Sequence, residues 1–144
     1  MPSPCPDVTF TCEGGSTEVY VLGPGDVPPG GLDTLAATGD IVLGNDKIVA
    51  VIDALDHPHY IAPTGGSVLD LGVRGKDNDS LRAVFGAIGL LPEEAFHYTS
   101  VELLEEGDVK AIQLLGTLDG YPAIPIATRY EIRPCEPGIR IRTE

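Results

Sequence analysis

The feature that most constrains this chain is an alternation of apolar and polar side chains near its C-terminus. The first set of alternate positions is Ile126, Thr128, Tyr130 and Ile132, and the second set is Ala127, Arg129, Glu131 and Arg133. A period of two is that of a β-strand with one face toward a core and the other toward solvent. After a break over 134–138, Ile139 and Ile141 alternate with Arg140 and Arg142. The two segments therefore predict two adjacent strands.

Turn-forming residues divide the rest of the chain into short apolar segments. Residues 41–43 and 48–52 flank Gly44-Asn45-Asp46, in which Asn and Asp tolerate the positive φ of a tight hairpin turn. Residues 99–105 and 109–117 flank a second turn, and Asp119-Gly120 marks the next reversal. The 18 glycines and 13 prolines are typical of many short strands. The pattern predicts an all-β fold, an antiparallel β-sandwich built of hairpins.

One segment departs from the strand pattern. Residues 81–91 are a plausible helix, with Asp79 or Ser80 as its N-cap and Pro92 beyond its end. Two glycines inside the segment make such a helix short or irregular. We therefore expect at most one short helix near 80–91.

The length of 144 residues fits a single domain. Residues 1–17 are predicted to be a poorly ordered lead-in, because three prolines precede only one short β-like stretch, and residues 18–144 are predicted to form the sandwich. The last strand stops at Glu144 in mid-pattern, and such a strand leaves an edge of unpaired N–H and C=O groups. Either more chain belongs there or another molecule covers the edge.

The three cysteines leave two alternatives open. Cys5 and Cys12 are close enough in sequence to close a small loop through a disulfide. In the other alternative all three cysteines are free thiols, and one of them is buried. Cys5 also fits a displaced lipoprotein-type anchor. The odd number of cysteines weakens any argument for a disulfide framework.

The formal charge of −13 argues against two classes of partner. Acidic residues outnumber basic ones by 22 to 9, so phosphate backbones and anionic lipid headgroups are repelled over most of the surface. No apolar run reaches the ~18–20 residues of a spanning helix, and no signal peptide precedes the domain. We expect an extracellular or periplasmic domain whose signal lies outside this sequence.

Three segments carry a resemblance to a known family. The residues Gly39–Ile52, Thr64–Asp70 and Arg129–Pro134 resemble the opening of supersandwich (galactose-mutarotase-like) domains, which occur in large secreted or lipid-anchored bacterial proteins. The resemblance spans about residues 39–143 and implies a large antiparallel sandwich of which this chain is roughly the first half. The catalytic His and Glu of the enzymatic relatives have no counterpart motif here, so the resemblance bears on fold more than on chemistry.

Two clusters have side chains suited to metal ions. His57 and His59 lie at i and i+2 on an extended segment, a spacing that places both on one Zn²⁺ if Asp56, Asp70 or His97 supplies a further ligand. Asp77 and Asp79 offer the hard oxygen ligands that Ca²⁺ prefers. For the first cluster, the structural alternative is a turn fixed by Pro58 that leaves both histidines as exposed or hydrogen-bonded loop residues. For the second cluster, it is a solvent-exposed turn. No glycine-rich phosphate loop is present, so no other cofactor is expected.

The four arginines of the last two predicted strands are the candidate ligand-binding residues. Arg129, Arg133, Arg140 and Arg142 are four of only nine basic residues and share one polar face. They fit an anion or a carboxylate-rich partner. The alternative is a solvated face with cross-strand pairs to Glu131 and Glu144.

These observations favour a non-catalytic module over an enzyme. We expect a secreted β-sandwich used for assembly, adhesion or carbohydrate contact, with a protein partner or a second copy pairing at the C-terminal edge. The alternative is a fragment of a mutarotase-like carbohydrate-active enzyme, which requires a groove with His57, His59 or His97 beside a carboxylate.

Overall fold

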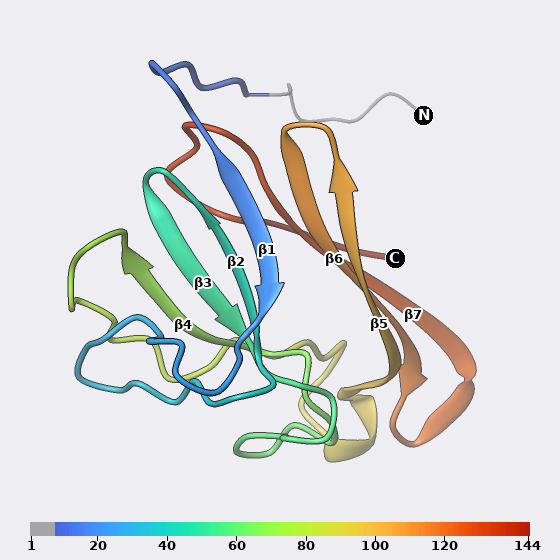
Figure 1. Cartoon of the computed structure of the whole chain (residues 1–144). Coiled ribbons are helices and arrows are strands. Elements are labelled where there is room, and N and C mark those ends of the chain that lie inside the picture. Colours follow the sequence, from blue (N-terminus) through green and yellow to red (C-terminus); the bar gives the residue numbers. More distant parts are fainter. Residues whose placement is uncertain (1–7) are drawn as a thin grey trace.

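The computed structural model describes residues 8–144 and has two four-stranded antiparallel sheets (Figure 1). The first sheet has the order β1-β2-β3-β4, with β1 at Thr17–Val21, β2 at Ile41–Asn45, β3 at Ile48–Ile52 and β4 at Val68–Val73. The second has the order β5-β6-β7-β8, with β5 at Phe96–Glu106, β6 at Val109–Leu118, β7 at Tyr121–Ile132 and β8 at Arg140–Thr143. The predicted all-β sandwich is confirmed.

The predicted hairpins lie where the turn residues place them. β2 and β3 pair across the turn at 46–47, and β5 and β6 pair across 107–108. β3 is a central strand and is almost wholly buried, as its continuous apolar run indicates. On β7 the side chains of Ile126, Thr128, Tyr130 and Ile132 are buried, so the period of two is confirmed.

The core lies between the two sheets and draws on both. Its fully buried aliphatic side chains include Leu43 and Ile52 from the first sheet and Ile112, Leu114 and Ile132 from the second. β1 contacts β5 and β6, and β2 contacts β6 and β7, so β4 and β8 are the edges at the opposite side of the sandwich.

A glycine lets one loop approach the core closely. Gly66 has φ +98°, and a Cβ there would lie 2.6 Å from the ring of Tyr98. The Gly66 carbonyl accepts a 2.7 Å bond from the Tyr130 hydroxyl, and the Tyr98 hydroxyl donates to Thr128. Both buried tyrosines therefore satisfy their polar ends inside the sandwich.

The segment near 80–91 forms no helix, which agrees with the expectation of at most one short helix there. Residues 80–91 are irregular, and the only helical element among the described residues is a 3₁₀ turn at Pro92–Glu94. The backbone of Val84 exchanges hydrogen bonds with Val68 at the start of β4, and the Gly86 carbonyl accepts from the Phe96 N–H. Pairing with two strands thus replaces the helical bonds that two glycines weaken.

The cysteine pairing differs from the expectation. Cys12 forms a disulfide with Cys135, 123 residues away, with a Cα–Cα distance of 5.5 Å. The predicted bridge from Cys12 to Cys5 is therefore wrong, and the alternative of three free thiols is excluded. Cys5 and the first part of the predicted lead-in at 1–17 lie outside the described residues. Sequence spacing favours local bridges, whereas this one joins parts that meet only after folding.

The β2–β3 hairpin is also joined to the connection between β7 and β8. The Asn45 side chain is buried and donates to the carbonyls of Arg133 (2.8 Å) and Glu136 (2.7 Å), while its Oδ1 accepts from the N–H groups of Lys47 and Ile48. Asp46 accepts a bond from the Cys135 N–H. These bonds and the disulfide form a junction that places the start of β8.

Replacing Asn45 tests the junction. In Asn45→Ala, two N–H groups and two carbonyls lose their partner, so we expect the free energy of unfolding to fall by about 2–4 kcal/mol in urea titrations. Asn78→Ala is the matched control, because its Oδ1 makes a single exposed bond to Val73 N–H, and a loss below about 1 kcal/mol is expected. Equal losses in the two variants would contradict the structural role of Asn45.

Candidate functional site

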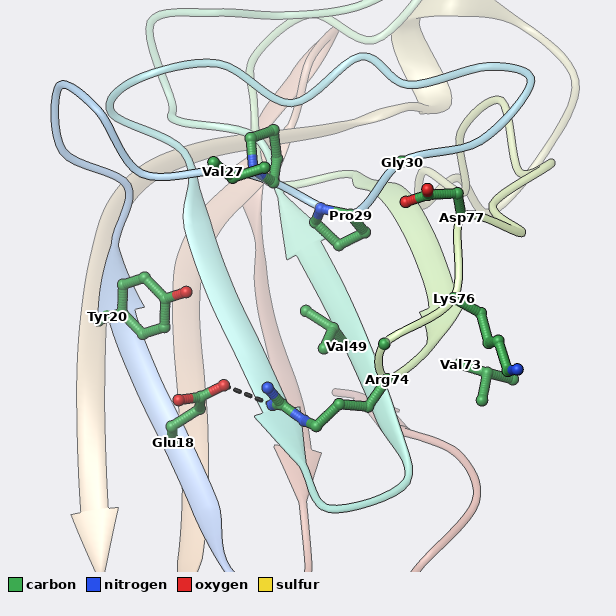
Figure 2. A pocket seen from close by; sticks show the side chains of 12 residues that line it. Glu18, Tyr20, Val27, Pro29, Gly30, Val49, Val73, Arg74, Lys76 and Asp77 are labelled. Atoms are coloured by element: carbon green, nitrogen blue, oxygen red, sulfur yellow. Dashed lines mark hydrogen bonds and ion pairs between the residues drawn. The ribbon is translucent and has the colours of Figure 1, made fainter.

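A pocket on the outer face of the first sheet gathers side chains from three strands and two loops (Figure 2). Its volume is about 300 Å³. Its wall is formed by Glu18 and Tyr20 of β1, Val49 of β3, Val73 of β4, and the segments 27–30 and 74–77. In Figure 2, Tyr20, Val49 and Pro29 surround the open space, with Glu18 and Arg74 at one end and Asp77 near the other.

An ion pair crosses β2 to close one end of this pocket. The Arg74 guanidinium donates to Glu18 and also to the Asn45 carbonyl. Gly44 lies beneath it, and a Cβ at that position would lie 2.6 Å from an Arg74 nitrogen. The glycine in β2 therefore makes room for the pair.

Tyr20 gives the pocket its only aromatic face. Partial burial raises the pKa of its hydroxyl above the usual value, and Glu18 and Asp26 raise it further, so the phenol stays neutral and can donate a hydrogen bond. Besides Tyr20, the described wall has the charged side chains of Glu18, Arg74, Lys76 and Asp77, which can hydrogen-bond to a polar ligand.

The two predicted histidine ligands lie beside different buried aspartates. His59 Nδ1 is 3.2 Å from the carboxylate of Asp53, and His57 Nδ1 is 3.8 Å from that of Asp40. The third histidine, His97, is 2.8 Å from Asp119. Each histidine thus has a carboxylate, as the mutarotase-like alternative requires, but five pockets on different parts of the surface have no histidine in their walls.

Asp53 is the most perturbed carboxyl group beside these histidines. Its side chain is fully buried, and desolvation raises its pKa to about 6, against the opposing effects of the bonds from His59 and from the N–H of Ser67. A carboxyl group with this pKa exchanges its proton near neutral pH. The same bonds fix the 53–67 loop, so the group also has a structural task.

The two aspartates proposed for Ca²⁺ lie in different surroundings. Asp77 is in the wall of the outer-face pocket. Asp79 is buried, and its Oδ1 accepts bonds from the N–H groups of Leu71 and Leu81, while Oδ2 has no hydrogen-bond partner among the described residues. The structure does not assemble His57, His59, Asp77 and Asp79 into one site, and metal binding by either pair stays a prediction.

The four predicted arginines lie on or beside the outer face of β7 and β8, and each has a carboxylate partner. Arg129 pairs with Glu106 at 2.6 Å and with Glu131 at 3.1 Å, and Arg133 also pairs with Glu131. The pKa of Glu131 lies below the usual value because the bonds from these two arginines outweigh its partial burial.

The remaining two arginines follow the same pattern. Arg140 pairs with Glu136 at 3.0 Å and Arg142 pairs with Glu144. Arg129 and Arg142 are directly opposite each other in the register of β7 and β8. An anionic ligand at this face therefore has to compete with carboxylates of the same chain, and anion binding stays a prediction.

The sequence did not indicate two groupings that the structure shows. The outer-face pocket joins β1 to a turn more than 50 residues later. In the sequence, Glu18 and Tyr20 are polar residues at alternate positions of one strand, which does not identify the turn that they face. Among the described residues, one set of three metal-ligand side chains converges, namely Cys12, Asp46 and Cys135. The disulfide occupies both sulfurs of that set.

Comparisons with known proteins add no assignment. No protein-family model, no curated protein and no solved structure matches this chain. The resemblance to supersandwich domains therefore stays a prediction. Within residues 8–144, no helix has the length and apolar character needed to cross a membrane.

The raised pKa of Asp53 predicts a specific pH dependence of stability. Between about pH 4 and pH 6 the folded state holds a proton on Asp53 that the unfolded state has lost, so stability falls as the pH rises through this window. Asp53→Asn removes that change, which amounts to roughly 2–3 kcal/mol. Urea titrations of both proteins at a series of pH values measure the difference.

A second variant controls for the assignment. His59 lowers the pKa of Asp53, so His59→Ala is expected to move the upper end of the window to higher pH. Parallel stability profiles for the wild type and Asp53→Asn from pH 4 to pH 7 would show that Asp53 has an ordinary pKa.

Proposed function

We propose that this protein is a non-catalytic assembly module that self-associates by pairing the edge strand β8 of two copies. One observation carries the proposal: within residues 8–144 no strand pairs with the outer edge of β8, whereas the edge of β4 on the same side of the sandwich is capped. Open edges attract other strands, and monomeric β-proteins commonly cover them.

The cap on β4 is made by the segment that follows it. The N–H of Val68 donates to Val84, that of Leu71 to Asp79, and that of Val73 to Asn78. Three N–H groups along this edge thus have partners within the chain. A further strand cannot add to β4 without displacing them.

The outward groups of β8 follow from its pairing with β7. Ala127 and Glu144 exchange both backbone hydrogen bonds, so the antiparallel pattern directs the groups of Arg142 toward β7 and those of Ile141 and Thr143 away from it. No described residue pairs with the outward groups. The Ile141 side chain lies on the inner face and is 51% exposed.

Charge limits the registers in which two β8 strands can pair. A two-fold register centred on Ile141 or on Arg142 sets arginine opposite arginine, which is destabilising. A register centred on Thr143 sets Arg142 opposite Glu144 of the second copy, in both directions. The proposed contact is therefore the antiparallel pair centred on Thr143.

The setting and the further uses of the module are part of the proposal. A disulfide between Cys12 and Cys135 is typical of extracellular or periplasmic proteins and supports export. Adhesion or carbohydrate contact would use the pocket of Figure 2, where the face of Tyr20 lies beside charged hydrogen-bonding groups.

Charge reversal at the proposed contact tests this function. Arg142→Glu and Glu144→Arg each set like charges opposite each other, and we expect each to weaken dimerisation by roughly tenfold or more, equivalent to about 1.4 kcal/mol. The double variant restores opposite charges and is expected to restore the dimer. Light scattering over a dilution series across the micromolar range gives the oligomeric state.

A backbone variant separates strand pairing from side-chain effects. Thr143→Pro removes the outward N–H and is expected to abolish dimers, whereas Thr143→Ala loses only the side-chain bond to Thr128 and is expected to retain them. A wild-type protein that stays monomeric throughout the series would refute self-association at β8.

A further inference from the structure

A second surface, at the end of the sandwich away from the β2–β3 turn, is an apolar groove. It lies between the loop that carries Ile61 and the irregular segment 85–95 (Figure 1). Its volume is about 360 Å³, within the range of ligand-binding clefts. Its wall consists of Ile61, Phe85, Ala87, Gly89, Leu90, Leu91, Pro92 and Ala95. Every one of these residues is apolar.

The large side chains at this groove are unusually exposed. Leu90 is 100% exposed and Ile61 is 77% exposed, and Leu91 of the same wall is also exposed, as are Val84 and Ile88 of the segment 81–91. Single exposed aliphatic residues are ordinary, but a contiguous group of them marks an interaction surface. Leu90 and Leu91 belong to the segment 81–91, which is irregular and does not form a helix with an apolar face toward the core.

Acidic residues lie next to the wall of the groove. The Glu94 carboxylate accepts a 3.0 Å bond from the N–H of Leu91, and Glu93, beside Pro92 of the wall, accepts a bond from Gly120 through its backbone carbonyl. The chain has no Lys or Arg between Lys47 and Arg74 or between Arg82 and Lys110. Arg82, the cation nearest in sequence to the groove, is paired with Asp33. The groove is thus apolar with an acidic rim.

We propose that this groove is the docking site for a basic, apolar segment of another protein. Aliphatic or aromatic side chains of the segment would fill the space between Ile61 and Leu90, while its Lys or Arg residues would face Glu93 and Glu94. The site is separate from β8 and does not depend on self-association there.

Charge also decides against the other occupants of such a surface. A second copy would bring an identical acidic rim, and an anionic lipid surface would be repelled in the same way. A partner with Lys or Arg flanking its apolar residues gains from both the groove and the rim. Its association is expected to be fast and to weaken as the salt concentration rises.

Two short fluorescent peptides of equal length test the proposal. One alternates leucine with lysine and the other alternates leucine with glutamate, and anisotropy measures their binding to the full chain. We expect saturable binding of the lysine peptide and none of the glutamate peptide. Leu90→Ser and Ile61→Ser are expected to weaken binding at least about fivefold each, and Glu93→Gln to weaken it mainly at low salt.

A matched control variant distinguishes the groove from general attraction to an acidic protein. Leu32 is 95% exposed and lies outside the wall of the groove, so Leu32→Ser is expected to leave the affinity unchanged. Equal binding of the lysine peptide to wild type, Leu90→Ser and Ile61→Ser would overturn the proposal. So would binding of the glutamate peptide, adsorption to phosphatidylcholine vesicles, or a dimer that Leu90→Ser abolishes and Arg142→Glu does not.

Discussion

The junction between the β2–β3 turn and the β7–β8 connection is the contact on which the rest of the structure depends. Asn45 uses both ends of its amide, one for its own turn and one for the carbonyls of Arg133 and Glu136. Asp46 and the Cys12–Cys135 disulfide secure the same connection. Without this contact the chain after Ile132 has no fixed direction, and β8 has no defined place beside β7.

Buried aspartates fix the long irregular segments in a similar way. Asp40 accepts bonds from the N–H groups of Ala37 and Ala54, and Asp70 accepts from Leu35 and Ala36. Asp53 and Asp79 do the same for the loops around them. Burial raises the pKa of Asp70 as it does that of Asp53, so each charged carboxylate costs folding free energy that the bonds from its backbone N–H donors partly offset. Part of the acidic composition is therefore structural.

Local patterns predicted the strands, and distant contacts decided what those patterns left open. The alternation over 126–133 and the turn at Gly44-Asn45-Asp46 correctly predicted β7 and the β2–β3 hairpin, because both depend on residues close in sequence. The segment 81–91 has the apolar content of a helix, yet its backbone pairs with β4 and β5.

For the candidate sites too, the sequence predicted features that depend on nearby residues and missed those that depend on distant ones. The alternation predicted that Arg129, Arg133, Arg140 and Arg142 share a face, and pairs with Glu131 and Glu144 were the stated alternative. Arg129 and Arg133 pair with Glu131 and Arg142 pairs with Glu144, whereas Arg140 pairs with Glu136. Three features join residues that are distant in sequence: the Cys12–Cys135 disulfide, the pocket beside Tyr20, and the groove between Ile61 and the segment 85–95. No periodic pattern in the sequence relates such residues, so the sequence alone could not predict these features. The metal and anion sites remain predictions for the same reason.

The proposed self-association requires that the outer edge of β8 is unpaired in the monomer and pairs with β8 of a second copy in the dimer. Amide hydrogen exchange, followed by NMR or by fragmentation in mass spectrometry, measures this directly at single N–H groups. We predict that the N–H group of Thr143 exchanges fast in dilute protein and slowly in concentrated protein, while that of Arg142 stays protected in both. Fast exchange of Thr143 at every concentration, or its protection already in the dilute monomer, would contradict self-association at β8.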